Sequence, residues 1–127
     1  MPMVLLIEDE DGLRTLLHTV LEEAGYHVWE AADGTEGLRL YGKEPVDLVI
    51  TDIYMPGCDG LEVLQTLRRQ NPTIKILAIT GRADIADFLE IAHMLGASAT
   101  LRKPFEMGVF VQTVGDLLSE GSSNELL

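Results

Sequence analysis

The segment "LVITDIYMPGCDG", residues 48–60, carries the clearest fold signal in this sequence. Apolar and β-branched residues lead directly into Asp52, and Met-Pro-Gly and Asp-Gly follow it. The apolar run predicts a strand that is buried on both faces, and the Pro and Gly residues predict a loop. Because a carboxylate is costly to bury without partners, we expect Asp52 to face a polar site at the end of this strand.

Segments of the same kind recur along the chain and alternate with helical patterns. The expected strands cover residues 3–7, 26–31, 47–51, 75–80 and 98–102. Apolar residues at helical spacing lie between these strands and predict helices. The helices are expected over residues 13–24, 34–43, 61–70, 85–95 and 105–118.

A strand–helix unit repeated five times predicts an α/β fold with a doubly wound parallel sheet and helices on both of its faces. The 127 residues suffice for one compact domain, which we place at residues 1–119. Residues 120–127, "EGSSNELL", are expected to form a flexible C-terminal tail.

The composition excludes several classes of function. Nine Lys and Arg residues against 21 Asp and Glu give a formal net charge of −12, which argues against a nucleic-acid or anionic membrane surface. Cys58 is the only cysteine, so neither an intramolecular disulfide nor a cysteine zinc site can form. The pattern shows no signal peptide and no membrane span, and we therefore expect a cytoplasmic protein.

Polar residues follow four of the five expected strands. Glu8 and Asp9 follow the first strand, Asp52 the third, Thr80 the fourth and Lys103 the fifth. Ligand sites of open parallel sheets lie beyond the carboxyl ends of the strands, so these side chains are expected to converge. Each one alone has an ordinary explanation, as a helix cap, a turn residue or a surface charge, but their coincidence at one edge favours a functional site.

The chemistry of this group is that of phosphoryl transfer. Three nearby carboxylates repel one another unless a cation intervenes, and Mg²⁺ prefers oxygen ligands of this kind. Lys103 supplies a compact positive charge and Thr80 a hydroxyl donor for phosphoryl oxygens. A carboxylate such as Asp52 can attack phosphorus and form an aspartyl phosphate.

The sequence closely resembles the receiver domain of two-component response regulators, over residues 3 to about 118. The matching pieces are "LLIEDE", "DLVITDIYMPGCDG", "ILAITG" and "LRKPF", in the family's order and spacing. The resemblance implies a flavodoxin-like fold of five strand–helix units with the strand order 2-1-3-4-5. It also implies a switch that is phosphorylated on Asp52 by a histidine kinase or a histidine phosphotransfer protein and then controls a downstream target or output domain.

The resemblance also assigns the metal ligands. Asp9 and Asp52 match direct ligands of Mg²⁺, and Glu8 matches a residue that reaches the ion through water. The backbone carbonyl of Tyr54 matches a further ligand.

The other matched positions concern the phosphoryl group and the response to it. Thr80 matches the switch hydroxyl, Lys103 the lysine that pairs with the phosphoryl group, and Pro104 a proline that follows a cis peptide bond. Thr100 stands where family members usually carry Tyr or Phe, whose inward movement accompanies that of the hydroxyl. The output is therefore expected to use the loop at residues 81–84, the fourth helix or dimerisation.

The leading interpretation is a signalling switch and not a multiple-turnover enzyme. Beside the kinase and output partners, the wide apolar arcs of the fourth and fifth helices leave two interpretations open, a homodimer face or packing against neighbouring helices. One alternative is a haloacid-dehalogenase-like phosphatase, although that family has a second Asp where this chain has Tyr54. The other alternative is a receiver-like interaction module that is never phosphorylated.

Overall fold

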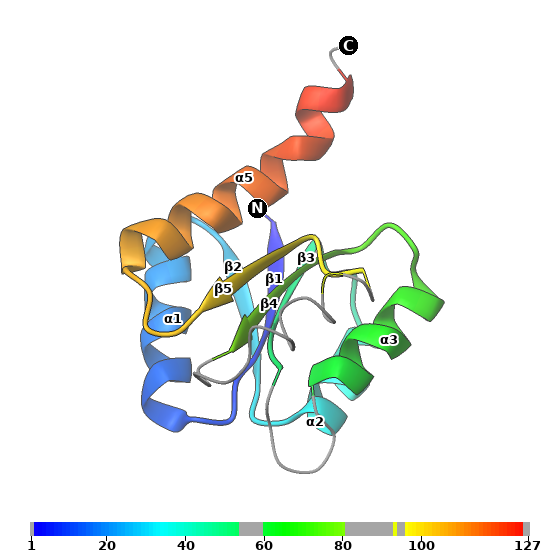
Figure 1. Ribbon diagram of the computed structural model, residues 1–127, viewed down its shortest axis with the longest axis horizontal. Coiled ribbons are helices and arrows are strands. Elements are labelled where there is room, and N and C mark those ends of the chain that lie inside the picture. The colour runs from blue at the N-terminus through cyan, green and yellow to red at the C-terminus, as the bar shows by residue number, and fades with distance from the viewer. Residues whose placement is uncertain (1, 54–59, 81–92, 94–95, 126–127) are drawn as a thin grey trace.

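The computed structural model describes residues 2–53, 60–80, 93 and 96–125. Its elements alternate between strand and helix through most of the chain (Figure 1). The strands are β1 (Met3–Ile7), β2 (His27–Ala31), β3 (Leu48–Asp52), β4 (Lys75–Thr80) and β5 (Ala99–Arg102). The helices are α1 (Asp11–Glu23), α2 (Gly34–Tyr41), α3 (Gly60–Gln70) and α5 (Met107–Glu125). The fourth expected helix, at residues 85–95, falls almost wholly outside the described residues.

All five strands form one parallel sheet in the order β2-β1-β3-β4-β5. This topology confirms the predicted doubly wound, flavodoxin-like α/β fold. The three inner strands are buried along almost their whole length, as their continuous apolar sequences predicted.

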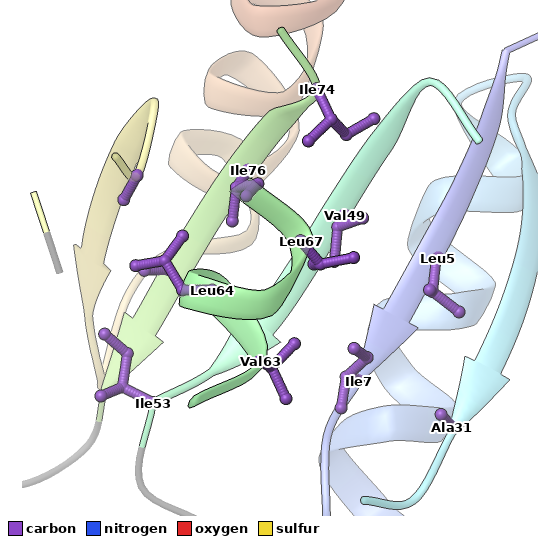
Figure 2. Packing of buried hydrophobic residues seen from close by; sticks show 12 residues of the cluster. Leu5, Ile7, Ala31, Val49, Ile53, Val63, Leu64, Leu67, Ile74 and Ile76 are labelled. Carbon is purple, nitrogen blue, oxygen red and sulfur yellow. The ribbon is translucent and has the colours of Figure 1, made fainter. Parts of the chain in front are cut away.

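Successive residues of each strand point to opposite faces of the sheet, so the domain has two apolar layers. Leu5 and Val49 face the layer that α2 and α3 cover, where Leu64 and Leu67 complete the packing (Figure 2). Val4 and Leu6 face the opposite layer, which α1 and α5 cover (Figure 1). Packing on both faces fixes the strand register, because a slip by one residue would turn every core side chain to the wrong layer.

Local signals set several of the element ends. Gly25 has φ of 100°, a left-handed conformation that suits glycine, and it follows α1 as the sequence predicted. Asp33 caps α2 by accepting a hydrogen bond from the backbone N–H of Glu36 at 2.8 Å. Among the described residues, no helix is both long enough and apolar enough to cross a membrane.

The C-terminal helix departs from the sequence prediction. We expected the fifth helix to end at residue 118, but the backbone of α5 is helical to Glu125 and extends beyond the sheet (Figure 1). The flexible tail at residues 120–127 stays a prediction. The Ser and Asn residues suggested a tail, yet their helix propensities are only moderately unfavourable, and the segment contains no proline that would stop the helix.

Candidate metal and phosphoryl site

Buried polar side chains gather where the inner strands end. Among the described residues the buried polar or charged ones are Glu8, Thr51, Asp52 and Thr80. Glu8 directly follows β1, Asp52 ends β3 and Thr80 ends β4, so the three share the carboxyl edge of the sheet. Only 1% of Glu8 and 5% of Asp52 is exposed. This edge holds charge in surroundings that would otherwise favour apolar side chains.

Backbone hydrogen bonds hold this edge in place just beyond the strands. The N–H of Glu8 donates to the carbonyl of Ala31 on the neighbouring strand at 3.0 Å. The N–H of Lys103 donates to the carbonyl of Thr80 at 2.7 Å in the same way. The sheet ladder therefore continues into residues that carry side chains of the candidate site, and their backbone is held by the same kind of hydrogen bond as a strand.

Lys103 joins two of the carboxylates. Its Nζ donates hydrogen bonds to Glu8 Oε1 and to Asp52 Oδ2, each at 2.9 Å. Burial acts to lower the pKa of Lys103, but the hydrogen bonds and charges of Glu8 and Asp52 together raise it above its usual range. The ammonium group therefore stays charged near neutral pH and offsets part of the repulsion between the two carboxylates.

The ionised form of Glu8 is disfavoured by its surroundings. Burial raises its pKa to about 7, and the Asp52 charge adds to this effect. The hydrogen bonds from Lys103 and from the backbone N–H of Glu10, which reaches Glu8 Oε2 at 3.1 Å, act in the opposite direction. A second cation at this edge would stabilise the ionised form of Glu8 further.

The structure brings the predicted acidic residues together. One carboxylate oxygen from each of Glu8, Asp9 and Asp52 lies within 4.8 Å of the other two. Asp9 is exposed, whereas Glu8 and Asp52 are buried, so the group opens to solvent on the Asp9 side. Among the described residues, three hard oxygen donors beside the ammonium of Lys103 leave a local excess of negative charge, and this donor set fits Mg²⁺.

The remaining predicted residues have mixed outcomes. Thr80 is fully buried at the end of β4, at the expected edge. The Lys103–Pro104 bond is cis, as the resemblance implied. Thr100 pairs with Ala78 in the sheet and is half-buried. Tyr54, expected to offer its carbonyl to the metal, lies outside the described residues.

Gly60 is a site residue that the sequence prediction missed. Its N–H donates to the carbonyl of Ile53 at 2.8 Å, and α3 begins at this glycine. A Cβ at this position would collide with the carbonyl oxygen of Asp52 and the Cα of Ile53. The Asp-Gly pair predicted only a turn, but the structure shows that glycine lets α3 approach the backbone of Asp52.

An apolar pocket borders the site. Its volume is about 250 Å³, and its lining residues are Leu13, Lys103, Pro104, Phe105 and Met107. The pocket therefore connects the ammonium of Lys103 to an apolar surface between α1 and the start of α5.

Comparison with known proteins gives a consistent family. Residues 4–115 match the response regulator receiver domain. The chain is 33% identical to the sporulation initiation phosphotransferase F of Bacillus subtilis over 82% of this chain and 83% of that protein. It is 36% identical to the transcriptional regulatory protein AfsQ1 of Streptomyces coelicolor, over 95% of this chain but only 53% of that protein.

One solved structure with the same fold was determined in complex with Mg²⁺-BeF. The response regulator TrrA of Thermotoga maritima, in complex with Mg²⁺-BeF, superimposes with a TM-score of 0.84 and 32% identity, covering 93% of this chain and 100% of that chain.

The chain belongs to the response regulator receiver domain family. Receiver domains are the phosphoacceptor switches of two-component signalling, and that is the function of this domain. The chain spans about half of AfsQ1, so the activity of any longer protein that contains such a domain is a separate matter.

Proposed function

We propose that Asp52 is the residue that receives the phosphoryl group, from a phosphohistidine on a histidine kinase or a histidine phosphotransfer protein. One observation carries this assignment. Asp52 is buried at the carboxyl end of β3, with its Oδ2 bonded to Lys103 at 2.9 Å and two more carboxylates alongside. The described site residues thus include a nucleophile, a fixed cation and a candidate metal-ligand set.

The reaction would proceed by displacement at phosphorus. A carboxylate oxygen of Asp52 forms the new P–O bond while the P–N bond to the donor histidine breaks, and the imidazole nitrogen leaves with the electron pair. Lys103 balances negative charge that builds on the phosphoryl oxygens, which requires its ammonium to turn from Glu8 and Asp52 toward the new group. The product is an acyl phosphate on Asp52.

Glu8, Asp9 and Asp52 would hold a Mg²⁺ ion at this site. When bound, the ion neutralises charge on the phosphoryl oxygens and helps to orient them. The exposed Asp9 leaves an approach from solvent, whereas the buried Glu8 anchors the acidic pair to the sheet.

The response to phosphorylation would begin at Thr80. Its place at the end of β4 puts its hydroxyl at the carboxyl edge that Asp52 shares. Thr100 has no aromatic ring to follow a movement of Thr80, so we propose that the signal leaves through the segment after β4 or through a dimer that uses α5. We also propose that the domain turns over only its own phosphoryl group and is not a general phosphatase.

The donor protein would dock on the apolar pocket beside Lys103. A phosphohistidine can reach Asp52 only if its protein rests on surfaces that flank the carboxyl edge. Leu13 and Phe105 line such a surface next to Lys103, and Leu16 on the same helix is 47% exposed. Apolar contact there would hold the donor while the charged groups perform the transfer.

The direct test is to phosphorylate the protein with acetyl phosphate in the presence of Mg²⁺. We expect one phosphoryl group per chain by intact mass, labile to hydroxylamine as acyl phosphates are, and mapped to Asp52. Asp52→Asn should abolish the adduct. Asp47→Asn is the matched control, because exposed Asp47 precedes the same strand at its opposite end.

An adduct that survives in Asp52→Asn, or none in the wild type, would contradict the assignment. Sustained turnover of a small phosphate ester such as p-nitrophenyl phosphate would instead favour the haloacid-dehalogenase-like alternative.

A further inference from the structure

Arg14 contacts three parts of the chain: the backbone just after β1, the first turn of α1 and strand β2. It lies in α1, and only 16% of its side chain is exposed. Its Nη1 donates a hydrogen bond to the backbone carbonyl of Glu8 at 2.9 Å, and its Nη2 donates to Asp11 Oδ1 at 2.7 Å. Its Nε lies 3.6 Å from Glu30 Oε1 on β2. Each side of the guanidinium group therefore faces a different part of the chain.

The contact with Glu8 is the one that bears on the site. The carbonyl of Glu8 belongs to the peptide bond between Glu8 and Asp9, the two residues of the acidic pair. The N–H of Glu8 is already fixed by Ala31 on β2. With Arg14 on the carbonyl, both backbone polar groups of Glu8 are bonded, and this fixes the backbone from which the Glu8 and Asp9 side chains extend.

A second layer of contacts holds Arg14 itself. Glu30 lies near Arg14 on one side and near His18 on the other, where His18 Nδ1 is 2.6 Å from Glu30 Oε2. Asp11 holds the guanidinium from the first turn of α1. Only the forked, planar group of arginine can meet all three partners at once.

We propose that Arg14 is a positioning residue for the metal site: it fixes the peptide between Glu8 and Asp9 so that both carboxylates face Asp52. This inference rests on the proposed function for the part that concerns Mg²⁺. Arg14 touches neither the metal nor the phosphoryl group in this assignment, and it acts through the backbone of the acidic pair.

The positive charge of Arg14 and its positioning role would change Mg²⁺ affinity in opposite directions. A cation near three carboxylates disfavours a second cation, so its removal would tighten Mg²⁺ binding if charge were all that mattered. Positioning predicts that removal weakens binding. Lysine separates the two roles, because it keeps the charge but cannot reproduce the three-way fork.

The experiment measures Mg²⁺ affinity by isothermal titration calorimetry for the wild type, Arg14→Lys and Arg14→Ala. We expect both variants to bind Mg²⁺ more weakly, by on the order of 10-fold, as for other residues that orient metal ligands. Arg39→Lys and Arg39→Ala are the matched controls, because Arg39 bonds Glu36 on α2 by two hydrogen bonds, and they should leave the affinity unchanged. Tighter binding by Arg14→Ala with an unchanged Arg14→Lys would overturn the proposal in favour of a charge effect.

Hydrogen exchange in metal-free protein gives an independent readout. The amide of Glu10, which bonds the Glu8 carboxylate, should lose protection in Arg14→Lys, whereas the amide of Ile53, which bonds Ile79 within the sheet, should not. A merely structural role would lower both protections together and would count against positioning, as would unchanged protection at Glu10. If the wild type bound no Mg²⁺, the proposed metal site would fail, but this exchange pattern would still decide whether Arg14 fixes the acidic pair.

Discussion

Residues of the apolar interior and Glu8 at the carboxyl edge of the sheet are buried to the same degree, but burial has opposite energetic effects on them. Leu5 lies within β1 and Glu8 directly follows that strand, and neither is more than 1% exposed. Burial of Leu5 stabilises the fold, whereas burial raises the pKa of Glu8 to about 7, so ionised Glu8 is held at a cost. The interior thus supplies the stability that lets the edge keep charged groups close together.

Loss of a core side chain should give the largest effect on stability and the smallest effect on chemistry. Leu67 is fully buried in α3 and packs in the layer with Val49 and Ile76 (Figure 2). Leu67→Ala should lower the free energy of unfolding by about 2–5 kcal/mol in urea titrations. Phosphorylation by acetyl phosphate at low temperature should stay within about twofold of the wild type, since ΔΔG values of distant sites usually add without coupling.

A folded Leu67→Ala variant that is no longer phosphorylated would contradict this prediction. Phosphorylation at the carboxyl edge would then depend on packing in the apolar interior.

Removal of the Lys103 ammonium should destabilise the protein through the carboxyl edge and not through the apolar core. Lys103→Met keeps much of the apolar stem but leaves Glu8 and Asp52 without their shared donor. In urea titrations we expect the free energy of unfolding to fall by about 1.5–3 kcal/mol at pH 8, in the range of hydrogen bonds to charged groups. The fall should be smaller at pH 5, where a carboxyl group can take up a proton. Lys75→Met, at the amino end of β4, is the control, and equal losses by both variants would contradict this expectation.

A side chain at Gly60, where α3 contacts the backbone of Asp52, should affect both stability and phosphorylation. In Gly60→Ala the new methyl group would meet the Asp52 carbonyl oxygen and the Cα of Ile53, so backbone must move. The free energy of unfolding in urea titrations should fall by about 1–3 kcal/mol. Phosphorylation by acetyl phosphate should be slower because Asp52 shifts. Gly108→Ala is the matched control, since a Cβ there meets no atom within 4 Å. Unchanged phosphorylation in Gly60→Ala would show that the edge tolerates this shift.

The smallest change for each step in conditions should be a dependence of stability on pH in the metal-free protein. The pKa of Glu8 is about 7 in the fold and near 4.5 in the unfolded chain, so the folded state holds an extra proton between these values. Stability should therefore fall as pH rises through that window, by at most about 1.4 kcal/mol per pH unit for one proton.

Glu8→Gln should remove this contribution, and urea titrations at several pH values with a chelator present would measure it. A stability that rises equally with pH in both proteins would exclude Glu8 as the source.

The sequence predicted secondary structure best where the burial of a residue follows from the residues next to it in the chain. Strands β1, β3 and β4 were predictable because burial on both faces demands a continuous apolar run. The predicted bounds of three strands differ from the observed ones by one residue: β2 and β5 begin one residue later, and β3 is shifted by one residue at both ends, so that Asp52 is its last residue. The extension of α5 was missed because its residues resemble a tail in composition alone.

The site was predictable as a set of residues but not as a set of contacts. Convergence of Glu8, Asp52 and Lys103 follows from the rule that parallel strands end at one edge. That Lys103 bonds both carboxylates, however, depends on side-chain geometry across segments far apart in the chain. Arg14 and Gly60 were missed for the same reason, because their partners are backbone atoms that no sequence pattern marks.

The helix α5 has a mechanical consequence. It begins at Met107, just after Lys103 and Pro104, and runs for 19 residues, or about 28 Å at 1.5 Å per residue. Its first half is anchored in the core by Phe110, Val114 and Leu117, beside the proposed phosphorylation site. A rigid tilt of the whole helix by a few degrees would therefore become a displacement of ångströms at its C-terminal end.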